Sequence, residues 1–324
     1  MTVCRRSPPK LFSWETIEVG EEFGPVDGII SDLLVKTHAY AVDDYGIWYF
    51  ESSPFGGRIG HPTLLANEIV GLFQLAYDTR LSYVGGLHAR NELEFLRPIF
   101  VGQRVTLRGR HSEKYQKRGQ NYRVLEGEVL DEAGQICLRT RATETVGFSA
   151  STPVGRGMST PAPDAITGEI PQGAPTVHRA SREVPVGAVL PSLTKHTTLE
   201  QSIAYSGFRY GWAEDGAKAM RFSIHTDPEE ARRRGQPDAI VQGLCSAAYL
   251  SELCTNFFGP AWLTTGRLSN AFIRPVIVRD TLTATGLVKR LEAEGDRKRL
   301  WLDVWCKNQR GELVTIGHAS AEVK

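Results

Sequence analysis

The chain has 324 residues, enough for two domains of ordinary size, each with a hydrophobic core of its own. Hydrophobic residues make up 41% and charged residues 23%, a balance typical of globular chains and not of disordered ones. The formal net charge is +1, so there is no overall basic excess to favour nucleic acid as a partner.

Cysteine usage and the N-terminus indicate a cytoplasmic protein. The five cysteines are scattered and odd in number, and none has a C-x-x-C spacing, so the sequence predicts neither a disulfide framework nor a metal site. Residues 1–9 are basic, but no apolar segment follows them, which argues against a secretory signal. No apolar run is long enough for a membrane span, so we expect no membrane partner.

The first half predicts one central helix followed by antiparallel strands. The apolar segment 62–77 has the length of a helix. It is followed by the run FLRPIFV at 95–101 and by two strand-like runs at 120–130 and 135–145. The turn sequence DEAG at 131–134 joins the last two runs into a hairpin.

A segment rich in Pro, Gly, Ser, Thr and Ala follows at 150–188, and most of it shows neither helical nor strand periodicity. The sequence therefore predicts a linker here. It separates an N-terminal domain at 1–149 from a C-terminal domain of similar size at 189–324.

The second half repeats the order of elements found in the first. It contains a helix-length apolar segment at 240–256, the run FIRPVIV at 272–278, the turn NQRG at 308–311, and strand-like runs at 299–306 and 312–323. A chance similarity of seven residues would not also reproduce the flanking elements, so the repeat indicates two copies of one fold. The second helix is apolar nearly all round and must be buried. A buried helix wrapped by an antiparallel sheet is the hotdog arrangement, so the predicted fold class is α+β, a double hotdog.

Further segments point to a protein family. In the first half these are SPFGGRIGHPTLLA at 53–66, GGLHAR at 85–90 and EFLRP at 94–98; in the second they are IHTDPEEA at 224–231 and PDAIVQG at 237–243. They resemble the helix starts and neighbouring segments of the MaoC-like acyl dehydratase and 2-enoyl-CoA hydratase group, in its double-hotdog form. The resemblance covers most of residues 12–148 and 190–324.

The resemblance implies a hydro-lyase that interconverts 2-enoyl and 3-hydroxyacyl thioesters by syn addition or loss of water. The acyl group is carried by coenzyme A or by an acyl carrier protein. Coenzyme A or phosphopantetheine thus enters as part of the substrate, and no other cofactor is expected. The family's site motif is Gly-Asp-x-Asn-Pro-aliphatic-His, whose carboxylate and imidazole share the acid–base work. A backbone N–H at the start of the buried helix binds the thioester oxygen as charge develops there.

The first half keeps only part of this motif. Asp44 matches the family aspartate, a Gly-Ile pair replaces Asn-Pro, and Tyr49 stands where the histidine is expected. We favour an inactive repeat, in which Asp44 is a cap or turn residue and the cavity takes up the acyl chain. His61, at the expected helix start, is the other candidate of this half; it either faces a ligand or caps backbone groups.

The second half keeps the histidine and loses the aspartate. His225 matches the family histidine, and it is either an acid–base catalyst or a packed structural residue. Met220, whose thioether has no proton to exchange, stands where the aspartate is expected. An apparent insertion at 211–218 carries Glu214 and Asp215. We predict that Asp215 replaces the missing carboxylate because the glycine after it can reverse the chain; the alternative is that both acids are solvated loop charges.

The start of the second helix and a basic cluster complete the candidate site. Gly243 and Cys245 mark the helix start, so their N–H groups are the predicted donors to the thioester oxygen. The Cys245 thiol is either a nucleophile or, as we favour, a small buried core group. The cluster Arg232, Arg233 and Arg234 either binds cofactor phosphates or an acidic carrier surface, or pairs with nearby glutamates on the surface.

These features predict a working cavity in the second half, walled by His225, Gly243 and the insertion. Asp44 and His225 are expected to lie far apart, as the two pseudo-equivalent sites of a double hotdog do. The alternatives are another acyl-thioester enzyme, such as a thioesterase, an isomerase or a biosynthetic tailoring enzyme, and a non-catalytic acyl-thioester binding protein. A carboxylate close to His225 would favour acid–base chemistry. One chain supplies both hotdogs, so we expect a monomer or a homodimer.

Overall fold

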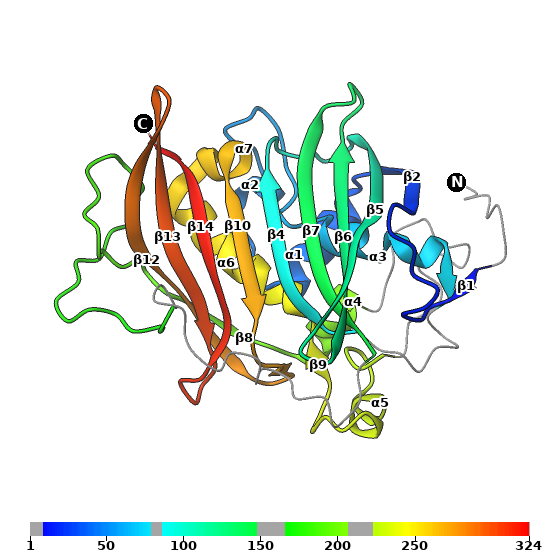
Figure 1. Ribbon diagram of the computed structural model, residues 1–324. Helices are drawn as coiled ribbons and strands as arrows, with labels where there is room; N and C mark the ends of the chain where they lie inside the picture. Colours follow the sequence, from blue (N-terminus) through cyan, green and yellow to red (C-terminus); the bar gives the residue numbers. More distant parts are fainter. Residues whose placement is uncertain (1–8, 79–85, 148–165, 207–222, 324) are drawn as a thin grey trace.

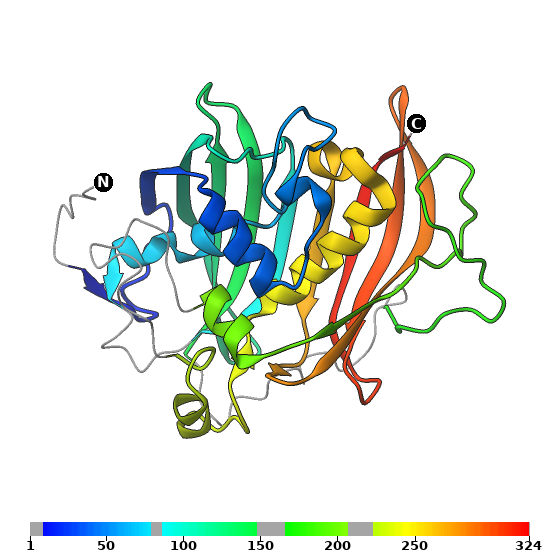
Figure 2. The same ribbon diagram turned by 180° about the vertical axis from the view of Figure 1, so that it is seen from behind.

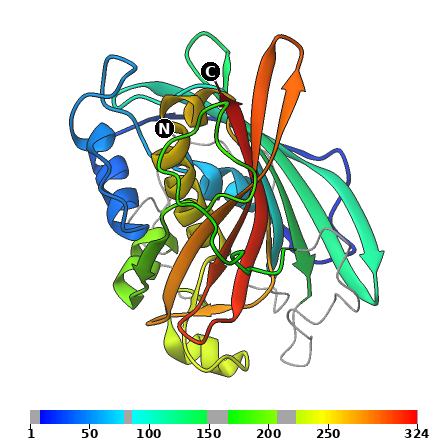
Figure 3. The same ribbon diagram turned by 90° about the vertical axis from the view of Figure 1, so that its left-hand side faces the viewer.

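The computed structural model describes residues 9–78, 86–147, 166–206 and 223–323. Its main feature is one ten-stranded antiparallel sheet, with the helices gathered on one face (Figures 1 and 2). The strand order is β2-β5-β6-β7-β4-β10-β14-β13-β12-β8, so the first half of the chain supplies five adjacent strands and the second half supplies the other five. Seen from the side, the helices lie on one side and the other strand face is open (Figure 3).

The strands of the first half are β1 (Lys10–Leu11), β2 (Glu22–Ile29), β3 (Tyr77–Asp78), β4 (His88–Phe95), β5 (Arg104–Lys117), β6 (Gln120–Leu130) and β7 (Ile136–Val146). Those of the second half are β8 (Leu193–His196), β9 (Ile240–Val241), β10 (Arg267–Phe272), β11 (Val276–Ile277), β12 (Thr281–Glu294), β13 (Arg297–Lys307) and β14 (Leu313–Val323). Two pairs of short strands, β1 with β3 and β9 with β11, lie outside the main sheet.

The helices of the first half are α1 (Asp32–Ala41), α2 (Ile47–Phe50), α3 (Ala66–Gly71) and the 3₁₀ helix η1 (Leu72–Leu75). Those of the second half are α4 (Leu199–Ser206), α5 (Pro228–Arg233), α6 (Gly243–Phe258), the 3₁₀ helix η3 (Gly259–Ala261) and α7 (Trp262–Thr265). Helices α1 and α4, one from each half, pack against each other over the same face of the sheet as α6 (Figure 2).

The repeat in the sequence is reproduced strand by strand. The strands β12, β13 and β14 have the same lengths as β5, β6 and β7, namely 14, 11 and 11 residues. They also begin at a constant distance along the chain from these counterparts: Thr281 corresponds to Arg104, Arg297 to Gln120, and Leu313 to Ile136. The two halves therefore correspond residue by residue through these strands, and the predicted pair of hotdog units is present.

The same side-chain device closes the last hairpin of each half. The side-chain oxygen of Asp131 or Asn308, the first turn residue, accepts the N–H groups two and four residues on at 2.8–3.1 Å. Gly134 and Gly311 then take positive φ angles of 73° and 75°, a conformation that glycine adopts without steric cost. Local turn chemistry thus sets the register of both hairpins.

Strands β4 and β10 join the halves into one sheet. Their register places Glu94 opposite Arg267 and Asn91 opposite Asn270. On the open face a chain of ion pairs crosses this junction, running from Arg108 through Glu128, Arg139 and Glu94 to Arg267. Such exposed pairs each contribute roughly 0–1 kcal/mol to stability, so their main effect is to keep this face polar.

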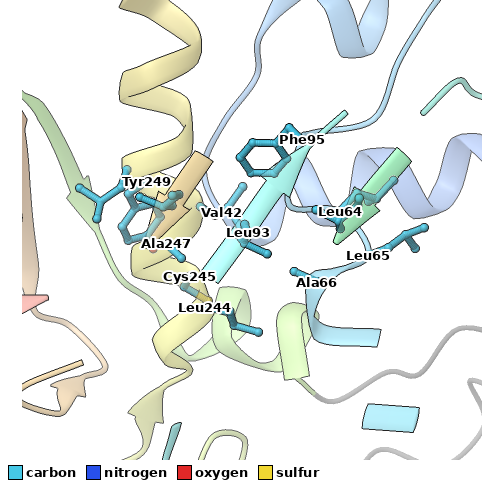
Figure 4. Packing of buried hydrophobic residues seen from close by; sticks show 14 of the residues in the cluster. Val42, Leu64, Leu65, Ala66, Leu93, Phe95, Leu244, Cys245, Ala247 and Tyr249 are labelled. Atoms are coloured by element: carbon cyan, nitrogen blue, oxygen red, sulfur yellow. The ribbon is translucent and has the colours of Figure 1, made fainter. Parts of the chain in front are cut away.

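Helix α6 forms the centre of the second half. Twelve of its 16 residues are buried, which agrees with a helix predicted to be apolar nearly all round. Figure 4 shows Leu244, Cys245 and Ala247 beside Leu93 of β4, so the core runs across the junction between the halves. Each fully buried aliphatic side chain of this kind contributes about 1.5–3 kcal/mol.

The central helix of the first half is shorter than the segment 62–77 that was predicted. Helix α3 ends at Gly71, and the next four residues continue as the 3₁₀ helix η1. Glycine costs about 1 kcal/mol relative to alanine within a helix, and it has no side chain to pack against the sheet. The prediction of one long helix is therefore wrong for this half, whereas α6 lies close to the predicted 240–256.

The described part of the predicted linker, residues 166–188, contains no helix or strand and lies along the edge of the second half (Figures 1 and 3). Its end is attached to β12, because the N–H of Gly187 donates to the carbonyl of Val288 and the N–H of Val288 donates to the carbonyl of Ala188, both at 2.8 Å. Within the described ranges, no helix is both long and apolar enough to cross a membrane.

Candidate active site

A short segment around His225 is held against β9. The N–H of Ile240 donates to the carbonyl of Ile224 at 2.8 Å, and Nδ1 of His225 lies 2.7 Å from the carbonyl oxygen of Ile240. The following residues begin helix α5, because the side chain of Asp227 accepts the N–H of Glu229 at 2.8 Å as an N-cap. The imidazole is thereby fixed between a strand and the start of a helix.

These contacts define the protonation state of the imidazole. A carbonyl oxygen only accepts, so Nδ1 of His225 carries the proton and donates it to Ile240. Nε2 is then the basic nitrogen, and no residue of the described segments forms a hydrogen bond with it. Burial lowers the pKa of His225, against the opposing effects of the bond to Ile240 and of the charge on Glu144. The side chain is therefore neutral at pH 7 with a free lone pair, as a general base requires.

His225 lines a cavity of about 100 Å³ that both halves build. The second half contributes Gly243, at the start of α6. The first half contributes His88 from β4, Glu144 from β7 and Asn67 from α3. A ligand in this cavity would contact an imidazole, a carboxylate and the positive end of a long helix.

The first turn of α6 is open towards this cavity. Gln242, its N-cap residue, makes no side-chain capping bond. A Cβ atom at Gly243 would lie 2.9 Å from the ring of Phe272, so only glycine fits there without a shift of the ring. The first N–H groups of a helix have no acceptor within it, so the N–H of Gly243 is a donor for a ligand.

Cys245 does not take the roles considered for a catalytic group. Its N–H donates to the carbonyl of Gln242 at 2.9 Å, so it is not a free donor for a thioester oxygen. Its side chain is buried, and burial raises the pKa of the thiol well above its ordinary value. A thiol in this state is protonated and inert, which supports the packing role.

Asp44, Tyr49 and His61 form a separate buried cluster in the first half. Oδ1 of Asp44 accepts the N–H of Gly46 at 2.9 Å, and Oδ2 accepts the hydroxyl of Tyr49 at 3.0 Å. Nε2 of His61 lies 3.4 Å from the same Oδ2. Nδ1 of His61 accepts the N–H of Thr63 at 3.1 Å, so the proton of this imidazole is on Nε2, towards Asp44.

Most polar atoms of this cluster have partners within the chain. Both oxygens of Asp44 and Nδ1 of His61 accept hydrogen bonds within the chain, and Nε2 of His61 contacts Asp44 only at 3.4 Å. Burial raises the pKa of Asp44, but the interaction with His61 and the hydrogen bonds from Gly46 and Tyr49 outweigh this effect and leave the pKa below its ordinary value. Asp44 therefore acts as a turn residue, which supports the interpretation of an inactive repeat.

A second cavity, of about 480 Å³, lies beside this cluster. Asp44 and Tyr49 line it from the first half, and Glu252 lines it from α6. Oε2 of Glu252 lies 2.7 Å from Nζ of Lys195. Burial and the charge of Asp44 raise the pKa of Glu252 to about 7, against the effect of Lys195. The use of this cavity for an acyl chain stays a prediction.

The other predicted site residues fall into two groups. Glu214, Asp215 and Met220 lie outside the described residues, so the predicted role of Asp215 stays a prediction. The arginines at 232–234 are held by neighbouring acids: Arg233 and Arg234 pair with Glu230 at 2.8 and 2.7 Å, and Arg232 lies 3.8 Å from Asp238. This pairing favours the surface interpretation of the cluster. Asp44 and His225 line different cavities, as expected of two pseudo-equivalent sites.

Buried polar residues of the first half were missed by sequence reasoning. These are His111 and Arg123, and Arg123 pairs with Glu144, which is partly buried. At the corresponding positions of the second half, in the strand alignment described above, the chain has buried apolar residues: Val288, Leu300 and Ala321. A residue-by-residue comparison of the two halves would have revealed them, because a buried charge opposite an apolar residue in a repeat calls for a separate explanation.

The chain is similar to proteins of one family in both sequence and structure. Residues 220–300 match the family model of the MaoC-like domain, a stretch that includes His225 and Gly243. A search of curated protein sequences gave no match. A solved structure described as a MaoC-like dehydratase superposes with a TM-score of 0.73 at 17% identity, over 96% of this chain and 100% of the other.

Two further structures share the fold. A Mycobacterium tuberculosis protein described as a double hotdog superposes with a TM-score of 0.59 at 17% identity, over 96% of this chain and 98% of the other. The peroxisomal multifunctional enzyme type 2 of Drosophila melanogaster superposes with a TM-score of 0.58 at 18% identity, over 94% of this chain and 48% of that enzyme. Likeness at such identities establishes the fold, whereas activity depends on the site.

The protein is a double-hotdog protein, which confirms the predicted fold class. Its residues 220–300 match the family model of the MaoC-like domain, in agreement with the resemblance seen in the sequence.

Proposed function

We propose that the chain is an acyl-thioester hydratase/dehydratase, which interconverts 2-enoyl and 3-hydroxyacyl thioesters at His225. The observation that carries the proposal is the state of this imidazole: Nδ1 is fixed by Ile240 at 2.7 Å, while Nε2 is free within the described residues. The same cavity contains the start of α6. The family match over residues 220–300 supports this assignment.

The chemistry in the direction of dehydration takes two proton transfers. Nε2 of His225 removes a proton from C2 of a 3-hydroxyacyl thioester, and the electron pair moves onto the thioester oxygen. The N–H of Gly243 and the positive end of α6 stabilise the enolate that forms. The imidazolium then returns the proton to the hydroxyl group on C3, the C3–O bond breaks, and water leaves. Both transfers occur on one face of the substrate, which makes the reaction syn.

The substrate is a thioester of coenzyme A or of an acyl carrier protein, whose phosphopantetheine arm enters as part of the substrate. Arg274 is exposed and lines the same cavity as His225, so it is placed to meet a phosphate or an acidic carrier. The described residues contain no group of three or more metal-ligating side chains, and the proposed steps use only the side chains and backbone of the chain. A monomer or a homodimer stays the expectation.

The proposal is tested with a panel of 2-enoyl, 3-hydroxyacyl and saturated thioesters of coenzyme A and of an acyl carrier protein. Mass detection of every product separates hydration from thioester hydrolysis, isomerisation and simple binding. With the enoyl substrates we expect a gain in mass of about 18 Da, because addition of one water forms the 3-hydroxy product. Release of free acid, or binding without turnover, would contradict the proposal.

The variant His225→Gln tests the site. Glutamine can still donate to the carbonyl of Ile240, but it cannot exchange a proton, so kcat should fall by about 10²–10⁴-fold. His196→Gln is the matched control, because His196 is an exposed strand residue whose bond to Thr281 at 2.8 Å lies outside the cavity. Unchanged turnover in His225→Gln would remove this residue from the mechanism.

A further inference from the structure

Glu144 is a carboxylate in the wall of the proposed active-site cavity, although it belongs to the other half of the chain. It lies near the end of β7, where its backbone is opposite His88 of β4 and Arg123 of β6. Glu144 lines the same cavity as His225 and Gly243. Among the residues that the structure describes, the other titratable or charged groups that line this cavity, apart from His225, are His88 and Arg274.

Buried partners fix the position of Glu144. One guanidinium nitrogen of Arg123 pairs with Oε2 of Glu144, and the other donates to Nε2 of His111 at 2.8 Å. The guanidinium also lies over the ring of Phe73, 3.7 Å from its centre. Arg123 is only 2% exposed, so it cannot leave this arrangement without a large loss of contacts. Glu144 is thus held by one oxygen, while Oε1 has no hydrogen-bond donor among the residues that the structure describes.

A purely structural role does not account for this arrangement. In the second half, the corresponding positions are filled by the buried residues Val288, Leu300 and Ala321, so the fold does not require an ion pair with a buried arginine there. A buried ion pair is often no more stabilising than apolar side chains of similar volume. The first half therefore keeps a desolvated charge beside the cavity of the second half for a reason other than packing.

We propose that Glu144 is the carboxylate that works with His225 in the water-transfer step, in the place of the missing family aspartate. This inference rests on the proposed hydratase/dehydratase function. In hydration, Oε1 of Glu144 accepts a hydrogen bond from the attacking water, while Nε2 of His225 takes the other proton. The water oxygen bonds to C3, the C2–C3 double-bond electrons move to the thioester oxygen, and the imidazolium then protonates C2. All atoms of the water end in the 3-hydroxyacyl product.

The cavity and its charges agree with this assignment. A volume of about 100 Å³ exceeds the ~10–15 Å³ that one water needs, so the cavity that both residues line has room for a reacting water. The negative charge of Glu144 also opposes the lowering of the pKa of His225 by burial, in agreement with a carboxylate near the imidazole. A carboxylate in this position stabilises the imidazolium that forms during turnover.

The experiment compares wild type with Glu144→Gln and Glu144→Asp. Gln keeps the size and can still accept from Arg123 but has no charge, so we expect kcat to fall by about 10²-fold with little change in KM. Asp keeps the charge, but its shorter side chain moves the carboxylate oxygen away from the cavity. We therefore expect kcat to fall less than in Glu144→Gln. Glu126→Gln is the matched control, because Glu126 is a β6 residue paired with Arg110 on the open face. Wild-type kcat in Glu144→Gln would overturn the inference.

A second measurement does not depend on turnover. The pKa of His225 is followed by NMR of histidine-labelled protein, with the resonance assigned through His225→Gln. Loss of the charge in Glu144→Gln should lower this pKa, whereas Glu144→Asp should keep most of the wild-type value. If wild type hydrates no thioester while the pKa of His225 still responds to Glu144→Gln, the proposed function fails and the coupling of the two residues stands. If the pKa does not respond, Glu144 serves only to neutralise Arg123.

Discussion

The hydroxyl of Tyr49 donates to Oδ2 of Asp44 at 3.0 Å, inside the buried cluster of the first half. The tyrosine stands where the family motif has its histidine. Instead of exchanging protons with the aspartate, it completes the aspartate's hydrogen bonding, together with Gly46 and His61. These contacts agree with the prediction that the first half is an inactive repeat.

Tyr49→Phe should therefore destabilise the protein without slowing it. Removing the hydroxyl takes one donor from a buried carboxylate, which costs about 1–3 kcal/mol of the free energy of unfolding. Urea denaturation measures this loss, and kcat should stay within about twofold of wild type, since the change lies away from the groups that transfer protons. A large fall in kcat at unchanged stability would place this cluster in the chemistry.

A variant of the first half that carries the corresponding apolar residues of the second half should keep its stability and lose its activity. The triple variant His111→Val, Arg123→Leu, Glu144→Ala copies Val288, Leu300 and Ala321. Since apolar replacements of buried ion pairs are often neutral or stabilising, we expect a free energy of unfolding at or above that of wild type, but no hydratase activity.

The single variant Arg123→Leu is the control for this prediction. It leaves the carboxylate of Glu144 without its buried partner and should cost about 3–5 kcal/mol. Chemical denaturation of both variants decides the matter. A triple variant less stable than Arg123→Leu would mean that His111, Arg123 and Glu144 are needed for the stability of the first half.

Gly243→Ala tests the start of α6. The new Cβ would approach the ring of Phe272 to 2.9 Å, so the ring or the helix start must shift. We expect a loss of about 1–3 kcal/mol in stability, as for other overpacked sites, and a lower kcat because the N–H donor moves with the helix. The double variant with Phe272→Leu makes room and should recover stability in thermal unfolding. Full activity in Gly243→Ala would remove this N–H from the proposed mechanism.

Glu252 should make stability depend on pH. Its pKa is raised to about 7 in the folded protein, so its unfavourable burial is felt only when it ionises. Its contribution to stability is fully present below the ordinary value near 4.5 and is lost as the pH rises through about 7. Since one pKa unit corresponds to about 1.4 kcal/mol, the change is on the order of 3 kcal/mol. The free energy of unfolding is measured from pH 4.5 to 8, and in Glu252→Gln it should change less with pH than in wild type. The same pH dependence in both proteins would contradict this.

Local patterns were enough to predict much of the fold. The turn residues Asp131 and Asn308 bond their own backbone, so the hairpins around them form from neighbouring residues, and their strands lie within a few residues of the predicted runs. The length of the first central helix was not predictable from its apolar character alone, because Gly71 weakens the helix at a point where the pattern continues.

The site was predictable only in the part that is local in sequence. His225 and Gly243 come from one half and were identified from nearby motifs. Glu144 reaches the same cavity from another hotdog, 81 residues earlier in the chain than His225, and no short pattern encodes a contact across that separation. The pairing of Asp44 with His61 also depends on the fold, since a buried histidine takes its partners from whichever groups the core brings near.

Because β4 and β10 pair at the middle of the sheet, each half depends on the other for hydrogen bonds to the backbone of its strand there. If the chain is cut in the linker and the halves are purified separately, each exposes a strand with unpaired N–H and C=O groups, His88–Phe95 in one and Arg267–Phe272 in the other. An open strand is a template for a second copy, so each isolated half should pair with itself or aggregate. When the two halves are mixed, pairing of each half with its own copy would compete with pairing between the two different halves. In the intact chain, the covalent link favours the pairing of the two different halves.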